Sequence, residues 1–171
     1  MKNRYIEIWK EIKKMDASIV DIGGRKEELF KNRPTNFKGY YFNFDILYGN
    51  DIMKEIKIKK KFDYAIMSHI IEHLDNPGLA LKNVRRLLKN GGTLIIVIPN
   101  SFSFRRFINY ILKRRLESYG GYETHFVSFN IETIKNLIEK WGFSIKKIRF
   151  YDQIINMGKF SEEIILICKK R

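Results

Sequence analysis

Four short apolar segments of this sequence each end beside residues that can bind a ligand. These residues are Asp21, Gly23 and Gly24 in "VDIGG", Asp45 in "FDI", Asp51 and Ile52 in "NDI", and Ser68 and His69 after "FDYAIM". Glycine lets a ligand approach the backbone closely because it has no Cβ. The types and order of these residues therefore predict a site for a nucleotide-like cofactor.

The residues around the second carboxylate suit the two parts of a nucleoside. Asp45 can accept two hydrogen bonds from the vicinal hydroxyls of a ribose. Asp51, with the backbone of Ile52, could meet an adenine edge, and Ile46 and Ile52 supply apolar walls. Each residue alone is a weak signal, because an aspartate at a strand end is often a turn or helix cap. The order and spacing of the whole set carry the inference.

Alternating apolar patterns predict the elements that must position these residues. Helical spacing is present at residues 5–15, 26–31 and 131–141, and a further helix begins at Asn76-Pro77 and ends at Gly91-Gly92. Strands are predicted at residues 18–22, 39–46, 51–52, 62–67, 93–99, 143–151 and 163–168. Strands that alternate with helices imply βαβ units, so we expect a doubly wound α/β fold with a mainly parallel sheet and helices on both faces.

Length and composition favour one domain. A chain of 171 residues with 44% hydrophobic residues can bury one sizeable core. The single cysteine, Cys168, excludes an internal disulfide framework and fits a reducing compartment. No apolar run approaches the roughly 20 residues of a membrane span. We therefore expect a soluble, cytoplasmic protein with one domain over residues 1–171.

The charge is strongly unbalanced. Lys and Arg number 33 against 19 for Asp and Glu, a formal net charge of +14. Such an excess favours an anionic partner, which can be a nucleic acid, a membrane surface or a phosphorylated substrate. A lysine-rich solvated surface without a partner is the alternative. The sequence has no aromatic-rich RNA-recognition motif, so nucleic acid is the weaker candidate.

The motifs together resemble class I S-adenosylmethionine-dependent methyltransferases, in particular small bacterial and archaeal members. The resemblance covers about residues 18–168 and rests on "VDIGG", "FDI", "NDI", "KFDYAIMSHIIEHLDNPGLALKNVRRLLKNGGTLIIVIPN" and "ETHFVSFNIETIKNLIEKWGF". It implies a Rossmann-like sheet of seven strands, the last one antiparallel, and S-adenosylmethionine as cofactor. It also implies methyl transfer, which we expect to go to a small-molecule or lipid-linked acceptor, and the charge excess favours an anionic one.

The resemblance implies a role for each candidate residue. Asp21, Gly23 and Gly24 would line the methionine end of the cofactor, Asp45 would hold the ribose, Asp51 and Ile52 the adenine, and Ser68 and His69 the far wall. Arg25 and Glu27 stand where the family usually has later glycines. Arg25 would either reach the methionine carboxylate or obstruct the pocket. A cofactor-binding regulatory module without turnover, or an RNA-binding methyltransferase, is therefore the alternative function.

Two histidines are candidate bases for a hydroxyl acceptor. His73 closes "HIIEH", and His125 lies in "ETHFVSF", where the family places a loop near the acceptor. Histidine titrates near neutrality, which suits proton transfer, and a purely structural role for both is the alternative. "HIIEH" also matches the H-x-x-E-H pattern of zinc proteases. Asp75-Asn76-Pro77 would interrupt the helix that such a site needs, so we predict no metal.

Residues 101–121 form a basic amphipathic insertion. Apolar residues recur at helical spacing, and cations flank them: Phe104, Phe107, Ile108, Ile111 and Leu112 beside Arg105, Arg106, Lys113, Arg114 and Arg115. One interpretation is a helix packed on the sheet with its basic side in water. The other is a lid over the acceptor, hinged at Gly120-Gly121, that also touches an anionic membrane or substrate.

Overall fold

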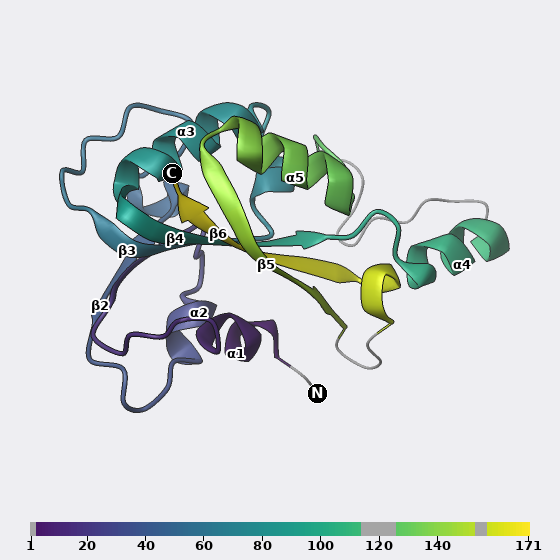
Figure 1. Cartoon of the computed structure of the whole chain (residues 1–171), viewed down its shortest axis with the longest axis horizontal. Coiled ribbons are helices and arrows are strands. Elements are labelled where there is room, and N and C mark those ends of the chain that lie inside the picture. The colour runs from purple at the N-terminus through teal and green to yellow at the C-terminus, as the bar shows by residue number, and fades with distance from the viewer. Residues whose placement is uncertain (1–2, 114–125, 153–156) are drawn as a thin grey trace.

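In the computed structural model, six strands form one mixed sheet with helices on both faces (Figure 1). The structure describes residues 3–113, 126–152 and 157–171. The strands are β1 Ser18–Ile22, β2 Tyr40–Phe44, β3 Phe62–Ser68, β4 Leu88–Pro99, β5 Phe143–Tyr151 and β6 Glu163–Lys170, and they lie in the order β2-β1-β3-β4-β6-β5. β6 runs antiparallel to both of its neighbours, and the other adjacent pairs are parallel. The mainly parallel sheet and the antiparallel last strand are thus as expected.

The prediction of seven strands is wrong for the described part of the chain, because residues 51–52 form no strand. Ile52 is buried in the core. Its carbonyl accepts a hydrogen bond from Nδ2 of Asn83 at 2.8 Å, and the same amide donates to the carbonyl of Lys54 at 3.1 Å. A side chain from the helix above therefore satisfies the backbone groups that a strand partner would otherwise have satisfied.

The two faces of the sheet carry different helices (Figure 1). α1 (Arg4–Trp9) and α2 (Glu28–Lys31) cover one face, and α3 (Pro77–Leu87) and α5 (Ile131–Lys140) cover the other. α1 is shorter than the predicted helix over residues 5–15. Trp9 joins the two helices of its face, since its indole N–H donates to the carbonyl of Leu29 at 2.8 Å.

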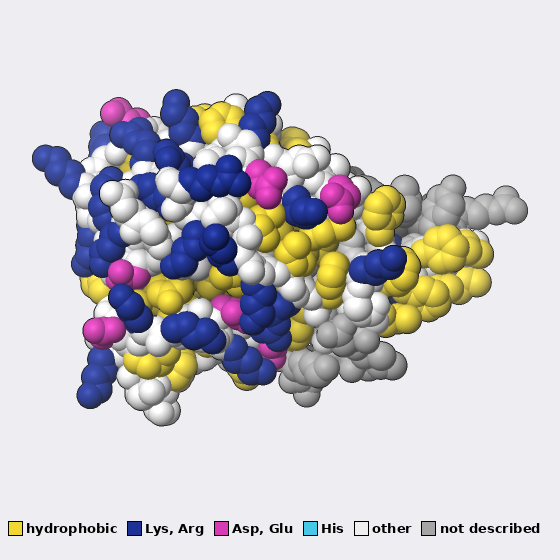
Figure 2. Space-filling model, in the orientation of Figure 1, with side chains coloured by type: hydrophobic (Ala, Val, Ile, Leu, Met, Phe, Trp, Pro, Cys, Tyr) yellow, Lys and Arg dark blue, Asp and Glu magenta, His cyan; other side chains and the backbone are white. Residues whose placement is uncertain are grey.

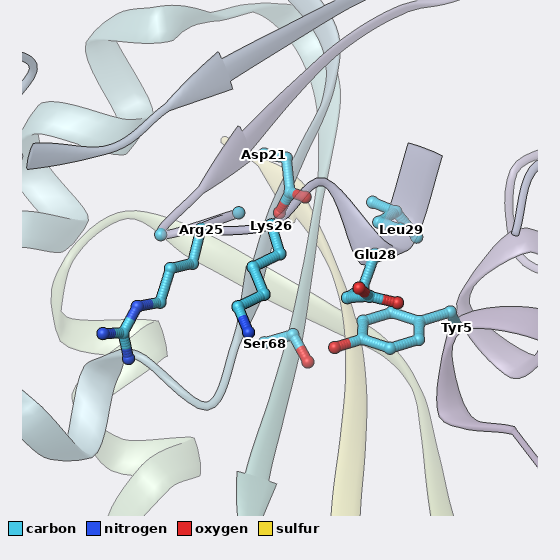
Figure 3. A pocket seen from close by; sticks show the side chains of 9 residues that line it. Tyr5, Asp21, Arg25, Lys26, Glu28, Leu29 and Ser68 are labelled. Atoms are coloured by element: carbon cyan, nitrogen blue, oxygen red, sulfur yellow. The ribbon is translucent and has the colours of Figure 1, made fainter. Parts of the chain in front are cut away.

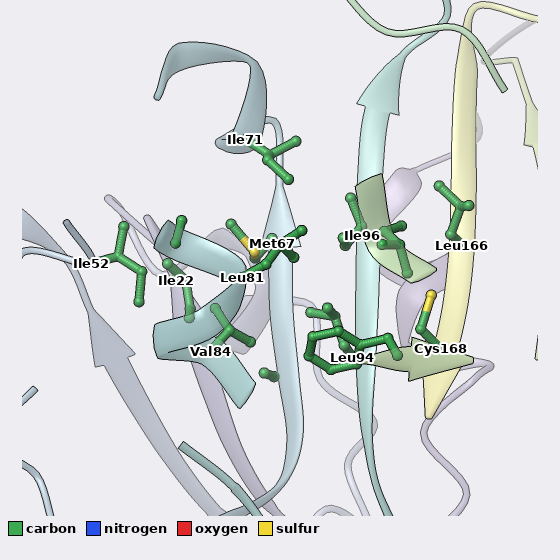
Figure 4. Packing of buried hydrophobic residues seen from close by; sticks show 14 of the residues in the cluster. Ile22, Ile52, Met67, Ile71, Leu81, Val84, Leu94, Ile96, Leu166 and Cys168 are labelled. Carbon is green, nitrogen blue, oxygen red and sulfur yellow. The ribbon is translucent and has the colours of Figure 1, made fainter. Parts of the chain in front are cut away.

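The larger hydrophobic core lies between the sheet and α3 with α5. Figure 4 shows Met67, Ile96 and Leu166 of three neighbouring strands in this layer, together with Leu81 of α3. Cys168 belongs to the same layer and is fully buried, and burial raises the pKa of its thiol to about 12. It is an apolar core residue here.

The start of α3 follows its sequence signals, but its end does not. The Asn76 side chain accepts from the N–H of Leu79, and Pro77 takes the first helical position. The helix ends at Leu87, before the predicted Gly91-Gly92, because β4 begins directly at Leu88. Pairing with β3 then skips from Leu88 to Thr93 and leaves both glycines in an irregular stretch of the strand.

The chain leaves the sheet after β4 and forms α4 (Phe104–Lys113), which projects beyond the carboxyl ends of the parallel strands (Figure 1). Residues 101–103 and α4 are the described part of the predicted basic insertion, and residues 114–121 with Gly120-Gly121 lie outside the described residues. None of the helices in the described ranges is long and apolar enough to span a membrane.

Candidate functional site

A pocket of about 300 Å³ opens where β1 and β3 end (Figure 3). Five predicted site residues line it, namely Asp21, Gly23, Gly24, Arg25 and Ser68, and Tyr5, Lys26, Glu28 and Leu29 complete the wall. The carboxyl edge of a parallel sheet is the place where such folds bind ligands. The loop after β1 thus lines a pocket although Arg25 and Glu27 replace the later glycines of the family.

The loop after β1 is fixed by its backbone conformation. Gly23 has a φ of +72°, and its N–H donates to the carbonyl of Phe44 at 2.9 Å. A Cβ on Gly24 would lie 2.5 Å from Oδ2 of Asp21, so this position also requires glycine. Glu27 has a φ of +56°, the left-handed region that glycine favours. The loop therefore keeps a glycine-like conformation at Glu27, one of the two positions where the family usually has glycine.

Arg25 and Lys26 point in different directions from this loop. Figure 3 shows the Arg25 guanidinium extending away from Asp21 and Tyr5, and the Lys26 amine directed toward Ser68. Lys26 is thus a second cation that can meet an anionic ligand group in this pocket. Lys26 was not among the predicted site residues, although a cation next to a glycine turn was a usable signal.

Asp21 is nearly fully buried at the end of β1. The hydroxyl of Tyr41 donates to its Oδ2 across 2.5 Å. Burial raises the pKa of Asp21 to about 7, a shift that the Tyr41 hydrogen bond opposes and the Asp45 charge increases. The carboxyl is therefore ready to ionise when a cationic ligand group lies beside it.

Asp45 connects the ends of two strands. Its Oδ2 accepts from the backbone N–H of Arg25 at 3.0 Å, and its Oδ1 accepts from the N–H of Leu47 at 2.9 Å, which caps the short turn η1 (Ile46–Tyr48). Each carboxylate oxygen has a second acceptor site. Asp45 thus holds the loop after β1 against the end of β2 and keeps capacity for ligand hydroxyls.

A second hollow of about 590 Å³ lies beyond Asp45 and is lined by Ile46 and Asp51, among others. Ile46 is 69% exposed, so it can contact a ligand face. Ile52, predicted as the other apolar wall, does not line this hollow because its side chain packs in the core.

His69 belongs to a buried charged network. Its Nε2 lies 3.1 Å from Oε1 of Glu163, its Nδ1 lies 3.3 Å from Oε1 of Glu72, and Arg4 pairs with Glu163 at 3.0 Å. Burial lowers the pKa of His69, but its contacts with the carboxylates of Glu163 and Glu72 outweigh this effect, and the net shift is upward. His69 does not line the pocket beside Ser68, so the structure gives it a supporting position.

Of the two candidate bases, His73 and His125, the structure describes only His73. His73 is half-buried in the short turn η2 (Ile71–His73), whereas His125 lies outside the described residues. The next residue, Phe126, donates its N–H to the carbonyl of Glu72 at 2.9 Å. His69 lies outside η2, so "HIIEH" does not form one helical face. Among the residues that the structure describes, no cluster of His, Cys, Asp and Glu side chains could hold a metal ion.

A third, apolar hollow of about 760 Å³ opens at the start of α4. Aromatic side chains dominate its wall, and two cations stand among them: Phe102, Phe104, Phe107, Phe160, Arg106 and Lys159. Figure 2 shows hydrophobic side chains gathered toward this end of the molecule. Arg105 of α4 forms an ion pair with Glu162 at 2.8 Å, so one cation of this helix is paired with a residue just before β6.

Buried hydrogen bonds fix the walls of this third hollow. Nδ2 of Asn100 donates to the carbonyls of Lys159 and Ser161 at 3.0 and 2.8 Å, and its Oδ1 accepts from the N–H of Phe102 at 3.1 Å. Ser101 donates its hydroxyl to the carbonyl of Phe129 at 2.7 Å. The hollow is therefore held in shape by the segments before α4, α5 and β6.

The first two hollows fit the cofactor that the sequence resemblance implies. Asp21 and Lys26 offer one charge of each sign, which suits the ammonium and carboxylate of an amino acid. Asp45 stands between the two hollows, at the end of β2, and Ile46 and Asp51 line the far one. This donor set matches a molecule with an amino-acid end, a ribose and a base.

Comparison with protein families gives an independent result. The family model described as a methyltransferase domain matches residues 2–148. No curated protein matches the sequence.

Solved structures with the same fold include three prokaryotic S-adenosylmethionine-dependent methyltransferases. The one from Archaeoglobus fulgidus is 21% identical with a TM-score of 0.68, and the alignment covers 98% of this chain and 90% of that one. The one from Thermotoga maritima is 16% identical with a TM-score of 0.65, covering 98% and 89%. The one from Methanosarcina mazei is 14% identical with a TM-score of 0.63, covering 99% and 98%. At these identities the likeness shows the fold alone.

Proposed function

Since this chain belongs to the family of S-adenosylmethionine-dependent methyltransferase domains, we propose that it methylates a small-molecule or lipid-linked acceptor that carries negative charge. The observation that supports this acceptor class is the third hollow, which combines phenylalanine walls with Arg106 and Lys159. An apolar wall with few charged groups suits a ligand with a large apolar part and an anionic group.

The cofactor would be held along the carboxyl ends of β1, β2 and β3. Asp21 would pair with its ammonium and Lys26 with its carboxylate, next to the close-packed Gly23 and Gly24. Asp45 would accept the ribose hydroxyls, and Ile46 and Asp51 would contact the adenine. Ser68 would bound the reacting end, and His69 would fix the backbone beside it through Glu72 and Glu163.

Methyl transfer depends mainly on how the acceptor atom is positioned against the methyl group of the cofactor. S-adenosylmethionine, when bound, supplies a methyl group on a positively charged sulfur. The acceptor atom must approach in line with that carbon–sulfur bond, and a fixed geometry can supply most of the rate effect. Asn100 and Ser101, whose side chains are held by hydrogen bonds, would orient the acceptor for this approach. For a hydroxyl acceptor, His73 or His125 would take up the released proton.

A labelled-methyl assay tests the acceptor class. The protein is incubated with S-adenosylmethionine bearing a tritiated methyl group and with two pools, one of lipid extract and one of small anionic aromatic compounds. We expect label in one of these pools and less in a pool of neutral sugars. Label only in the neutral pool, or in none despite cofactor binding by calorimetry, would contradict the proposed acceptor or the turnover itself.

Two variants of α4 test whether the third hollow binds the acceptor. Phe107→Ser changes a wall residue and should lower methyl transfer with little effect on cofactor affinity. Leu112→Ser on the same helix lies outside the wall and is 76% exposed, so it should leave transfer unchanged. Equal losses in both variants would mean that the face of α4, and not the hollow, engages the acceptor.

A further inference from the structure

The edge of the sheet opposite the pockets carries a dense group of cations. We call this group the basic end, and it comprises Lys61, Arg85, Arg86, Lys169, Lys170 and Arg171. Figure 2 shows Lys and Arg side chains gathered over the side of the molecule that lies away from α4. The group joins the loop before β3, the last turn of α3 and the end of β6.

Hydrogen bonds between these three segments place the cations next to one another. Lys61 donates to the carbonyl of Arg86 at 2.6 Å, and Arg85 donates to the main-chain oxygen of Arg171 at 2.9 Å. Lys169 and Lys170 donate to the carbonyls of Gly91 and Leu88 at 2.9 and 2.8 Å. In the described ranges, no side-chain carboxylate forms an ion pair with any cation of the basic end.

Some cations elsewhere are paired with carboxylates, and so is Lys89 next to the basic end, which contacts Asp63 at 2.8 Å. Arg149 contacts both Glu7 and Glu11, and Lys147 contacts Glu11 at 2.8 Å. At the basic end, by contrast, burial lowers the pKa of Lys170, and the positive charges of Arg85 and Lys61 lower it further. Like charges are thus held together at a cost to the folded protein, which a polyanionic partner would offset.

The kind of polyanion follows from what surrounds the cations. Large exposed apolar side chains cluster on and beside α4, for example Phe104, Phe107 and Leu112, and not at the basic end. A bilayer contact through inserted apolar groups would therefore use the α4 end and turn the basic end away from the membrane. Near the basic end, Lys60 lies over the Tyr40 ring at 3.2 Å, so the exposed aromatic there is already covered by a cation.

We propose that the basic end binds the phosphate backbone of a single-stranded RNA, without reading its sequence. Lysine and arginine side chains suffice for such contacts, which release counterions from the nucleic acid. Contacts to phosphates carry no sequence information, which is the reason to expect little base preference. This inference does not depend on the acceptor proposed above, because the pockets lie at the other edge of the sheet.

Fluorescence anisotropy with a labelled single-stranded RNA oligonucleotide of mixed sequence tests the inference. The variant Lys61→Gln, Arg86→Gln, Lys169→Gln removes three exposed cations of the basic end. We expect its affinity to fall about tenfold or more at low salt, and the slope of log affinity against log salt to become shallower by about 2, since each lost phosphate contact contributes about 0.7 for a single strand.

A matched control removes the same charge elsewhere. Lys10→Gln, Lys31→Gln, Lys135→Gln takes away three cations that pair with carboxylates on their own helices. It should bind RNA almost as the unchanged protein does. Calorimetric binding of S-adenosylhomocysteine by both variants confirms that each is folded.

Three outcomes would overturn the inference. One is an equal loss in both variants, which would make the binding a general effect of net charge. Another is no binding of RNA by the unchanged protein at low salt. The third is binding to vesicles rich in phosphatidylserine, but not to RNA, that disappears in the basic-end variant, which would assign this surface to a membrane.

Discussion

The backbone N–H of Arg25 donates a hydrogen bond to Oδ2 of Asp45 across 3.0 Å. This bond joins Arg25, which lines the first pocket, to the end of β2, where Phe44 and Ile46 on either side of Asp45 line the second. If Asp45 holds the ribose as proposed, its substitution should change cofactor affinity and local stability together.

Replacing Asp45 with alanine should weaken cofactor binding and lower stability together. Two backbone N–H groups lose their acceptor, which costs about 1–2 kcal/mol. The proposed ribose contacts are also lost, so affinity for S-adenosylhomocysteine should fall about ten- to a hundredfold. Asp45→Asn keeps one acceptor oxygen and should lose less of both. Calorimetry and urea unfolding measure the two effects, and unchanged affinity in a folded Asp45→Ala protein would place the ribose elsewhere.

Asp21 should make stability depend on pH in a definite direction. The fold raises the pKa of Asp21 from 3.8 to about 7, so the folded protein holds this proton more tightly than the unfolded chain does. Its contribution is therefore fully present below about pH 4 and is lost as pH rises to about 7, an effect of the order of 4 kcal/mol at most. Asp21→Asn, which cannot titrate, should lack this decline. Parallel curves of unfolding free energy against pH for the two proteins would refute the raised pKa.

Cofactor binding should show the opposite trend at Asp21. If the carboxylate pairs with the ammonium of the cofactor, affinity should rise as pH increases through about 7 in the unchanged protein, because the ionised form is the one that binds. Asp21→Asn should bind more weakly and show a flatter profile. Titration calorimetry at several pH values measures the cofactor affinity of both proteins. If affinity does not change with pH in either protein, Asp21 does not pair with the ammonium of the cofactor.

Glu27 offers a stabilising substitution. Its φ of +56° is strained for a residue with a side chain, so Glu27→Gly should raise the free energy of unfolding by about 1 kcal/mol. The neighbouring Glu28→Gly is the control, since Glu28 lies in the regular helix α2 and should lose about 0.5–1 kcal/mol. Thermal melting of both variants checks the signs. A lower melting temperature for Glu27→Gly would show that its side chain contributes more than its backbone costs.

Asn100 should matter more for stability than its neighbour Ser101. Asn100→Ala removes three hydrogen bonds of a buried amide and leaves two carbonyls unsatisfied, which should cost about 2–4 kcal/mol. Ser101→Ala removes one side-chain bond and should cost about 1 kcal/mol. Urea unfolding measures both. Equal costs would mean that the segment before β6 stays in place without Asn100.

Much of the fold was predictable because periodicity and caps act locally. The buried parts of β4 and β6, residues 94–99 and 164–168, are continuous apolar runs, and Asn76-Pro77 marks a helix start by its own side-chain chemistry. The same reasoning predicted a strand at residues 51–52, and this prediction was wrong. Ile52 was predicted to lie in a strand, but the carbonyls of Ile52 and Lys54 bond the side chain of Asn83, a residue about 30 positions away. A local pattern cannot show such a partner.

The candidate site was predictable at its strand ends and less so around them. Asp21, Gly23, Gly24 and Ser68 line one pocket because parallel strands end at one edge. Tyr5 and Glu28 join that pocket only because α1 and α2 pack on the same face of the sheet. The left-handed backbone of Glu27 also had no sequence signal, since glutamate rarely adopts it.

The position of β6 has a consequence for how the chain folds during its synthesis. Among the described strands β5 pairs only with β6, and β6 lies between β5 and β4 although it follows both in the sequence. When β5 leaves the ribosome it therefore has no partner, and its edge and the apolar edge of β4 stay open until residues 163–170 emerge. Such long-range pairing slows folding and exposes aggregation-prone edges meanwhile. A chain arrested before residue 163 should accordingly need a chaperone that shields β-edges.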